Sequence, residues 1–121
     1  MVDVPPDRFD ELVDQALERI PDELARHMEN VVVIVEERPT PGQQAPHPGS
    51  LLGLYEGVEL TRRSPSSYTA VMPDRITIFA ENHRRICRTE EELRERIART
   101  VVHEVGHHFG IDDARLRELG W

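Results

Sequence analysis

Several common features are missing from this sequence of 121 residues, and each absence narrows what the protein can be. Cys87 is the single cysteine, so no disulfide can form within the chain and a reducing compartment is permitted. No apolar run approaches the roughly 20 residues of a membrane-spanning helix, and the N-terminus lacks the basic and apolar segments of a signal peptide. We therefore expect a cytoplasmic protein with no membrane association, in which Cys87 is a small buried side chain.

Lysine is absent as well, and the 15 basic residues, all arginine, are outnumbered by 23 acidic ones, for a formal net charge of −8. This balance argues against nucleic acid as a partner, because nucleic-acid binding calls for a basic stripe. A cationic peptide or protein is a more suitable partner, because the negative net charge would attract it. The length predicts one domain over residues 1–121, with a modest core and room for no more than a shallow substrate groove.

The most informative pattern is His103-Glu104-Val105-Gly106-His107, which reads H-E-x-x-H. Histidines four residues apart on a helix lie about 40° apart around its axis, so both imidazoles face one side, a turn apart. That separation suits two nitrogen ligands of a tetrahedral Zn²⁺. Glu104 falls beside this face, where it can act as general base toward a metal-bound water without ligating the metal.

The motif continues to Gly110 and then to Asp112 and Asp113. Glycine adopts the left-handed φ that turns a chain sharply at a helix end, so Gly110 is expected to end the helix. The turn can bring Asp113 back as third ligand, leaving a fourth position open as in catalytic zinc sites. Asp112 is the alternative third ligand, or a residue that hydrogen-bonds a ligand histidine.

Periodicity predicts the elements around the motif. A helix over Phe9–Ile20 with Asp7 as its cap, a short helix from Pro21 to about Met28, and a short helix over Glu81–Arg88 are expected. Five β-branched residues at Val31–Val35 predict a strand buried on both faces, and shorter strands are expected within Leu51–Leu60 and Asp74–Ala80. Thr89 and Glu92 form a capping-box pattern ahead of the main helix, whose core stripe is Leu93, Ile97, Val101 and Val105.

Loops are expected at Ser64–Ser67 and at Arg38–Ser50. The second segment holds four prolines and is long for an inert connection, so it is either a lid over the site or a disordered excursion.

Residues 100–119 resemble the active-site end of a family of small bacterial zincin-like metallopeptidases, also described as minimal metalloproteases. The similarity extends upstream to Gly53–Thr61 and Pro73–Phe79 and so covers most of the chain. It implies a compact α+β zincin-like fold, in which a small sheet packs on the active-site helix. It also implies His103, His107 and Asp113 as ligands of Zn²⁺ and Glu104 as the base.

The sequence therefore predicts a zinc-dependent peptidase acting on a peptide or protein, in which Glu104 activates a zinc-bound water. Tyr55 and Tyr68 are candidate donors to the oxyanion, although each is more often a packed edge residue. His108 either orients Glu104 or is exposed, and His47 is expected to be solvated. The alternative function is a catalytically silent zinc-binding module, since no methionine follows Asp113 to form the Met-turn of the related metzincins.

Overall fold

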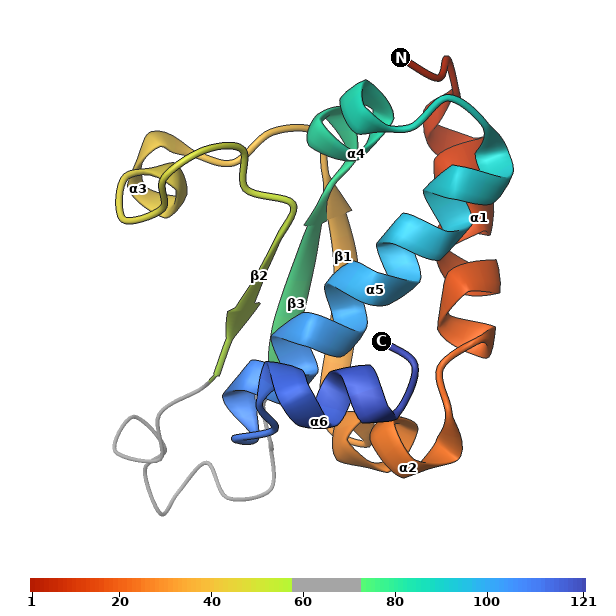
Figure 1. Cartoon of the computed structure of the whole chain (residues 1–121). Coiled ribbons are helices and arrows are strands. Elements are labelled where there is room, and N and C mark those ends of the chain that lie inside the picture. The colour runs from red at the N-terminus through yellow and green to blue at the C-terminus, as the bar shows by residue number, and fades with distance from the viewer. Residues whose placement is uncertain (58–72) are drawn as a thin grey trace.

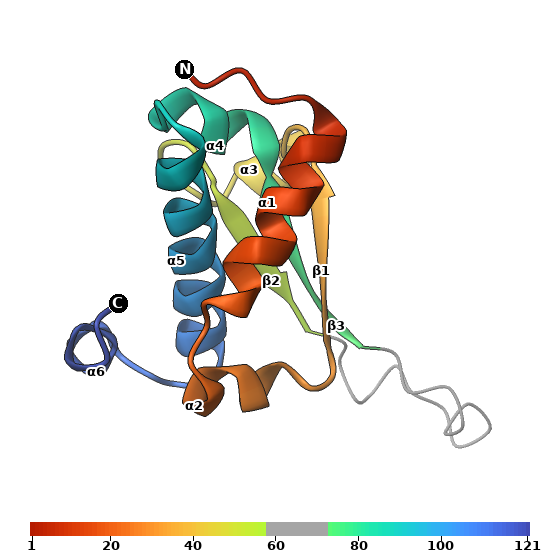
Figure 2. The same ribbon diagram turned by 90° about the vertical axis from the view of Figure 1, so that its right-hand side faces the viewer.

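The computed structural model of the chain describes residues 1–57 and 73–121. The predicted Ser64–Ser67 loop and Tyr68 lie outside the described residues. A three-stranded sheet forms one layer, and the helices α1 (Pro6–Glu18) and α5 (Glu90–His108) lie side by side across one of its faces (Figures 1 and 2). The buried apolar side chains of the two layers form one core cluster, which confirms the predicted α+β class.

The sheet has the order β1-β3-β2, with β3 (Asp74–Phe79) between β1 (Val31–Glu36) and β2 (Gly53–Glu56). Strands β1 and β3 are parallel, with Val33 opposite Ile76, and β2 is antiparallel to β3, with Tyr55 opposite Ile76. All three strands coincide with the segments predicted from the sequence. Strand β3 carries the core of the sheet, because Ile76 and Ile78 are fully buried on one face.

The prediction that Val31–Val35 is buried on both faces is wrong. Strand β1 lies at an edge of the sheet, and Val32 keeps 42% of its surface exposed. Helices cover the opposite face, so Val32 faces solvent although it is apolar, as does the acidic Glu36 at the end of the strand. A β-branched run shows that a strand forms, but not whether the strand becomes central.

Helix α1 buries the stripe that its spacing predicts, through Phe9, Leu12, Val13 and Ala16. Asp7, however, is not its cap. The helix begins at Pro6, a residue suited to the first turn because its missing N–H would have no partner there. Pro5 occupies the cap position with no side-chain bond, and Asp7 lies within the first turn, where its charge favours the positive end of the helix dipole.

Short helices connect the two layers: α2 (Asp22–Ala25), the 3₁₀ turn η1 (Arg26–Met28), α3 (Pro41–Gln44) and α4 (Ala80–Ile86). The first two and α4 match the sequence prediction closely. Helix α3 lies within the proline-rich segment, where Thr40 and Gln43 form a reciprocal capping box. That segment therefore contains a capped helical turn, which Figure 1 places beyond β2, away from the helical layer. His47 of the same segment is near enough to Glu104 to lower its pKa, so a lid over the site stays a prediction.

Helix α5 buries Leu93, Ile97, Val101 and Val105, the stripe predicted for it. Thr89 caps it by accepting a bond from the Glu92 N–H at 3.1 Å. The second bond of the capping box differs from the prediction. The Glu92 carboxylate accepts not from the N–H of Thr89 but from that of Arg88, one residue upstream, at 2.7 Å.

No helix among residues 1–57 and 73–121 is long and apolar enough to cross a membrane.

Cys87 and His83 are both buried in the interior of the protein. Cys87 is 3% exposed and belongs to the core cluster, as predicted. His83 is fully buried, and sequence analysis did not identify it. One ring nitrogen, Nδ1, donates to the carbonyl oxygen of Phe79 at 3.0 Å, and the other, Nε2, lies 2.9 Å from the Thr100 hydroxyl. The pKa of His83 is lowered from 6.5 to about 4, mainly by burial; the hydrogen bond to Phe79 acts against this shift, and the charge of Arg96 acts with it.

Acidification from pH 7 to pH 4.5 is expected to cost the fold about 2–3 kcal/mol through His83 alone. In the unfolded chain the imidazole binds its proton near pH 6.5, but in the fold it does so only near pH 4. Its contribution is therefore complete above pH 6.5 and is lost as the pH falls toward 4. Urea unfolding at the two pH values measures the loss, and His83→Gln should show a correspondingly smaller pH dependence. Equal pH dependence in both proteins would contradict this assignment.

Candidate metal centre and active site

The C-terminal end of α5 presents His103 and His107 on one side of the helix, one turn apart. Their ring centroids are 5.8 Å apart, with the rings nearly perpendicular. This face is different from the buried stripe that ends in Val105, so the imidazoles are only partly covered: His103 keeps 36% and His107 54% of its side-chain surface exposed. Solvent and solutes can therefore reach both rings.

Gly110 turns the chain back immediately after α5, as the sequence predicts. Its φ is +76°, in the left-handed region that glycine favours. The N–H of Ile111 donates to the carbonyl of Gly106 at 2.7 Å, and the N–H of Gly110 to that of His107 at 3.3 Å. These are the two bonds of a Schellman motif, which satisfies the last carbonyls of the helix. The turn leads into α6 (Asp113–Glu118), a helix that the sequence analysis did not predict.

Helix α6 places Asp113 beside the two histidines. One carboxylate oxygen, Oδ1, lies 3.0 Å from Nε2 of His107 and 3.8 Å from Nδ1 of His103. One potential ligand atom from each of the three residues can be chosen so that all lie within 4.8 Å of one another. The hydrogen bond from His107, more than any other contact, lowers the pKa of Asp113. The structure thus brings together all three residues that the sequence proposed as ligands.

Asp112 has another role. Its carboxylate is the N-cap of α6 and accepts a bond from the N–H of Arg115 at 2.8 Å. A cap of this kind points along its own helix end, so it fixes the start of α6 and hence the position of the next residue, Asp113.

Gly106 also helps to place α6. A Cβ atom at this position would lie 3.1 Å from a methyl group of Leu116, which is fully buried. The absence of a side chain on α5 therefore lets α6 pack closely beside the histidines.

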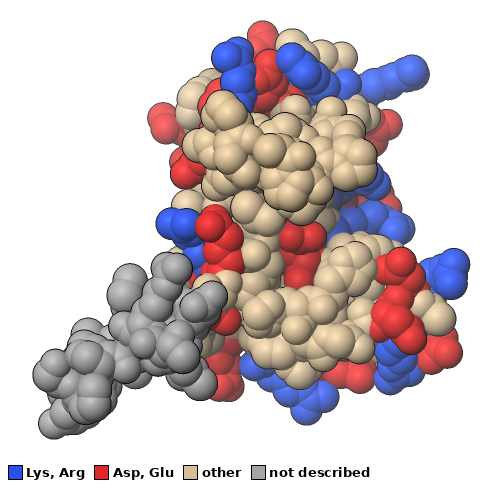
Figure 3. Space-filling model, turned by 90° about the vertical axis from the view of Figure 1, so that its left-hand side faces the viewer, with Lys and Arg blue, Asp and Glu red and all other residues tan. Residues whose placement is uncertain are grey.

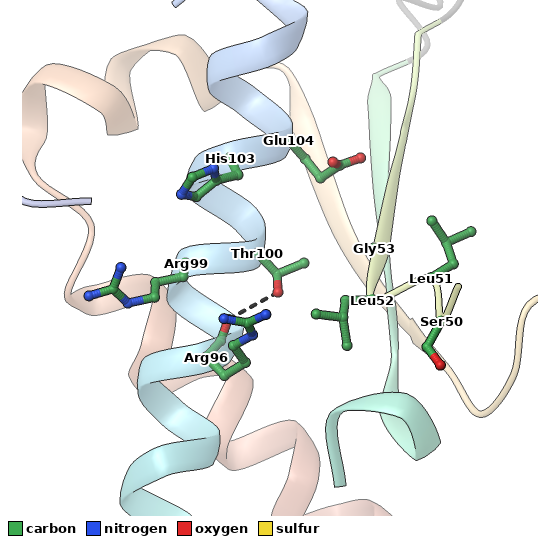
Figure 4. Close-up of a pocket in the computed structure, with 9 residues that line it drawn as sticks. All are labelled: Ser50, Leu51, Leu52, Gly53, Arg96, Arg99, Thr100, His103 and Glu104. Atoms are coloured by element: carbon green, nitrogen blue, oxygen red, sulfur yellow. Dashed lines mark hydrogen bonds between the residues drawn. The ribbon is translucent and has the colours of Figure 1, made fainter. Parts of the chain in front are cut away.

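Glu104 points away from His103 and toward β2 (Figure 4). Its carboxylate oxygen Oε1 accepts a hydrogen bond from the backbone N–H of Tyr55 at 3.0 Å. Burial raises the pKa of Glu104, although the Tyr55 N–H and the nearby histidines, His47 among them, act in the opposite direction. Glu104 is thus a partly buried carboxylate that is hydrogen-bonded to β2, the edge strand of the sheet.

The close contact between β2 and α5 depends on Gly53. A Cβ atom there would lie 2.6 Å from a methyl carbon of Thr100 and 3.7 Å from Cγ of Glu104. Any side chain would push the strand away from the helix and from Glu104. No such role for Gly53 was predicted, because the contact joins segments that are distant in the sequence.

Tyr55 and His108 pack against each other beside the site. The hydroxyl of Tyr55 donates to Asp74 at 2.7 Å, so this tyrosine approaches Glu104 through its backbone and not through its hydroxyl. Burial, together with the bond to Asp74, raises the pKa of Tyr55. His108 is exposed, with 39% of its side-chain surface accessible, which is one of the two alternatives given for it. Its ring stacks on that of Tyr55, with centroids 3.9 Å apart.

Trp121 contributes a contact that sequence analysis missed. Its carbonyl oxygen lies 3.0 Å from Nε2 of His103 and accepts a bond from Arg99 at 3.2 Å. The other ring nitrogen of His103, Nδ1, is the one nearer Asp113. A carbonyl on the far nitrogen of a ligand histidine fixes its ring orientation. No spacing rule indicates this partner, since it comes from a segment beyond α6.

A cavity of about 300 Å³ opens directly beside His103 and Glu104. Figure 4 shows its two walls: α5 supplies Arg96, Arg99 and Thr100, and the chain entering β2 supplies Ser50, Leu51, Leu52 and Gly53. The face drawn in Figure 3 is largely uncharged, with acidic atoms recessed near its centre.

Comparisons with known proteins identify the family and a similar fold. Residues 28–121 match the family described as zincin-like metallopeptidases. A search of curated proteins finds no match. Among solved structures, a conserved hypothetical protein from T. thermophilus is similar, with a TM-score of 0.54 and 22% identity over 88% of this chain and 94% of that one. At this identity the likeness shows the fold alone.

Proposed function

Because this chain belongs to the zincin-like metallopeptidase family, we propose that it is a zinc-dependent peptidase. The observation that carries the proposal is the convergence of His103, His107 and Asp113 at the end of α5, with Glu104 beside them and tethered to an edge strand. Three protein donors with one position left open are the pattern of catalytic, and not structural, zinc sites.

The residues present fit a zinc ion. The donor atoms of neighbouring ligands in a tetrahedral zinc site are about 3.3 Å apart, and Asp113 Oδ1 lies 3.0 and 3.8 Å from nitrogens of the two histidines. Two imidazoles and one carboxylate are a donor set that zinc accepts. His103, His107 and Asp113 would hold the ion. When bound, zinc would supply a Lewis acid that polarises a peptide carbonyl and makes water a stronger acid.

Glu104 would move the proton in this reaction. Its carboxylate accepts a proton from the attacking water and passes it to the nitrogen of the leaving amine. Partial burial makes the carboxylate a stronger base than an exposed glutamate. The Tyr55 N–H holds one oxygen, Oε1, so the geometry leaves the other oxygen to receive the proton.

The substrate would lie along β2. Among the residues that the structure describes, this strand pairs with β3 on one side only, and the Tyr55 N–H on its other side points toward α5. An extended peptide can add to such an edge as a further strand, through backbone hydrogen bonds. That placement would bring a peptide bond past Glu104 and the histidines. We expect the substrate to be a peptide or protein met in the cytoplasm.

A silent zinc-binding module is the second candidate. One observation favours it: the Tyr55 hydroxyl is bonded to Asp74 and so is not directed at the site, which leaves the oxyanion without that donor. Such a module would bind zinc through the same three residues and hold a partner along β2 without cleaving it.

The two candidates are separated by metal analysis combined with peptide cleavage. Elemental analysis of the purified protein should find about one zinc per chain, as three protein ligands and one water would give. The zinc-loaded protein is then incubated with a broad peptide library, and the same protein treated with a chelator is the control. Cleavage that requires zinc supports the peptidase, whereas zinc binding without cleavage of any peptide supports the silent module.

A further inference from the structure

The cavity beside Glu104 has an unusual charge for this protein. The chain as a whole is strongly acidic, at −8, yet the helical wall of this cavity carries two arginines and no acid apart from Glu104 itself. The opposite wall is uncharged and includes Leu51 and Leu52. A positive site thus lies next to the proposed catalytic residues of a negatively charged protein.

The two arginines differ in how they are engaged. Arg99 donates to the carbonyl of Trp121 at 3.2 Å and lies 3.5 Å from Glu95. Figure 4 shows its side chain extending to the side of α5 away from Leu52, whereas Arg96 lies beside Thr100 on the side facing the cavity. Among the described residues, none forms a hydrogen bond or ion pair with the side chain of Arg96. Its guanidinium therefore has five donors available for a ligand.

The position of Arg96 relates it to the proposed reaction. Arg96, Thr100 and Glu104 succeed one another at intervals of four along α5, so they share one face of the helix. The axial distance from Arg96 to His103 is about 10 Å at 1.5 Å per residue. An extended peptide covers that distance in about three residues. A group bound by Arg96 would therefore belong to a residue close to the bond that is cut.

We propose that this cavity is a substrate subsite that binds a carboxylate through Arg96, so that the protein prefers peptides with an acidic group within about three residues of the cleaved bond. Guanidinium and carboxylate form paired, charge-assisted hydrogen bonds, and the flanking leucines would cover the methylene groups of the bound residue. The preference is the opposite of the cationic partner that net charge suggests. The charge of Arg96 also contributes to lowering the pKa of His83, behind Thr100, which agrees with a guanidinium held against this wall.

The carboxylate could belong to an acidic side chain or to the C-terminus of the peptide, and a binding experiment distinguishes these sources. The probes are dye-labelled nonapeptide amides of alanine and serine, with one Glu, Gln or Lys placed at each position in turn. The uncharged parent peptide is also made as a free acid. Binding by fluorescence anisotropy uses the Glu104→Gln protein, so that no probe is cut, both with zinc and after chelation. The second condition excludes a carboxylate bound by the metal.

At one or two positions, Glu should bind about 10-fold more tightly than Gln, with or without zinc, if a side chain is recognised. A similar gain of the free acid over the amide indicates the C-terminal carboxylate. Arg96→Gln should abolish the gain, Arg96→Lys should retain part of it, and Arg96→Glu should transfer the preference to Lys. Arg85→Gln is the matched control, because it removes the same charge from an exposed site on α4 and should leave the preference intact.

Equal binding of Glu and Gln peptides, a gain that survives Arg96→Gln, or no binding of any probe would overturn the subsite. The inference rests on the proposed peptidase function, but the two can fail separately. Carboxylate binding that depends on Arg96 in a protein that cleaves nothing would remove the peptidase and keep the subsite. Zinc-dependent cleavage without acidic preference would do the reverse.

Discussion

Replacing Glu104 with glutamine is expected to reduce peptide hydrolysis by about 10²–10⁴-fold, the usual weight of a general base. The side chain points toward β2 and away from His103, and it is not one of the three clustered donors, so its replacement leaves those donors in place. The glutamine carbonyl can still accept the bond from the Tyr55 N–H, which keeps the side chain where it is. Only the ability to take up a proton is lost. The variant should therefore retain zinc as the parent does.

Both proteins are loaded with zinc and assayed against one peptide library at neutral pH, and their metal content is measured in parallel. Circular dichroism and thermal unfolding check that the variant is folded. Undiminished cleavage by Glu104→Gln would show that another residue is the base. Loss of zinc together with loss of activity would show instead that Glu104 supports the metal centre, which the geometry does not predict.

The sequence was most predictive where structure follows from local spacing. The stripe of Leu93, Ile97, Val101 and Val105 identified the buried face of α5, and the position of Gly110 identified its end. Both depend on interactions within a few residues: side chains one turn apart share a face, and a glycine in the left-handed conformation commonly follows the end of a helix. The segments of all three strands were predicted for the same reason.

The sequence could not predict features that depend on distant segments. Whether Val31–Val35 became a central or an edge strand was decided by where β2 joined the sheet, on the far side of β3. His83 is buried because α4 folds against α5, where Thr100 meets its ring. The spacing of residues along the chain does not indicate either contact, so a buried histidine could not be distinguished from a surface histidine by sequence alone.

The candidate site shows the same division. The i, i+4 relation of His103 and His107 indicated a shared face, and the structure places their rings together with Asp113. The support around them was not predictable: Tyr55 approaches Glu104 by its backbone, and the carbonyl of Trp121 meets His103. Every residue has backbone groups, so the residue type does not indicate which of them will form a hydrogen bond with the site. The groups that hold the proposed catalytic side chains are therefore visible only in the fold.

The two neighbouring aspartates provide the sharpest test of the proposed metal centre. Asp113→Ala is expected to weaken zinc binding by more than about 100-fold, beyond the 10–100-fold typical of groups that only orient a ligand. The reason is direct: its Oδ1 lies 3.0 Å from the His107 ring nitrogen, in the cluster of donors. Asp112→Ala should weaken binding by about 100-fold at most, because its carboxylate caps α6 and so acts on the cluster only through the position of that helix.

Titration against a competing chelator measures both affinities, and His103→Ala with His107→Ala sets the level of a destroyed site. Asp112→Asn is the matched control, since asparagine caps a helix nearly as well as aspartate and should restore most of the affinity that alanine loses. Asp113→Asn should not recover in this way, because an amide oxygen lacks the charge that balances a dication. Equal losses at the two positions, or the larger loss at Asp112, would reverse the assignment. Zinc retained at about one per chain by the double histidine variant would remove the site altogether.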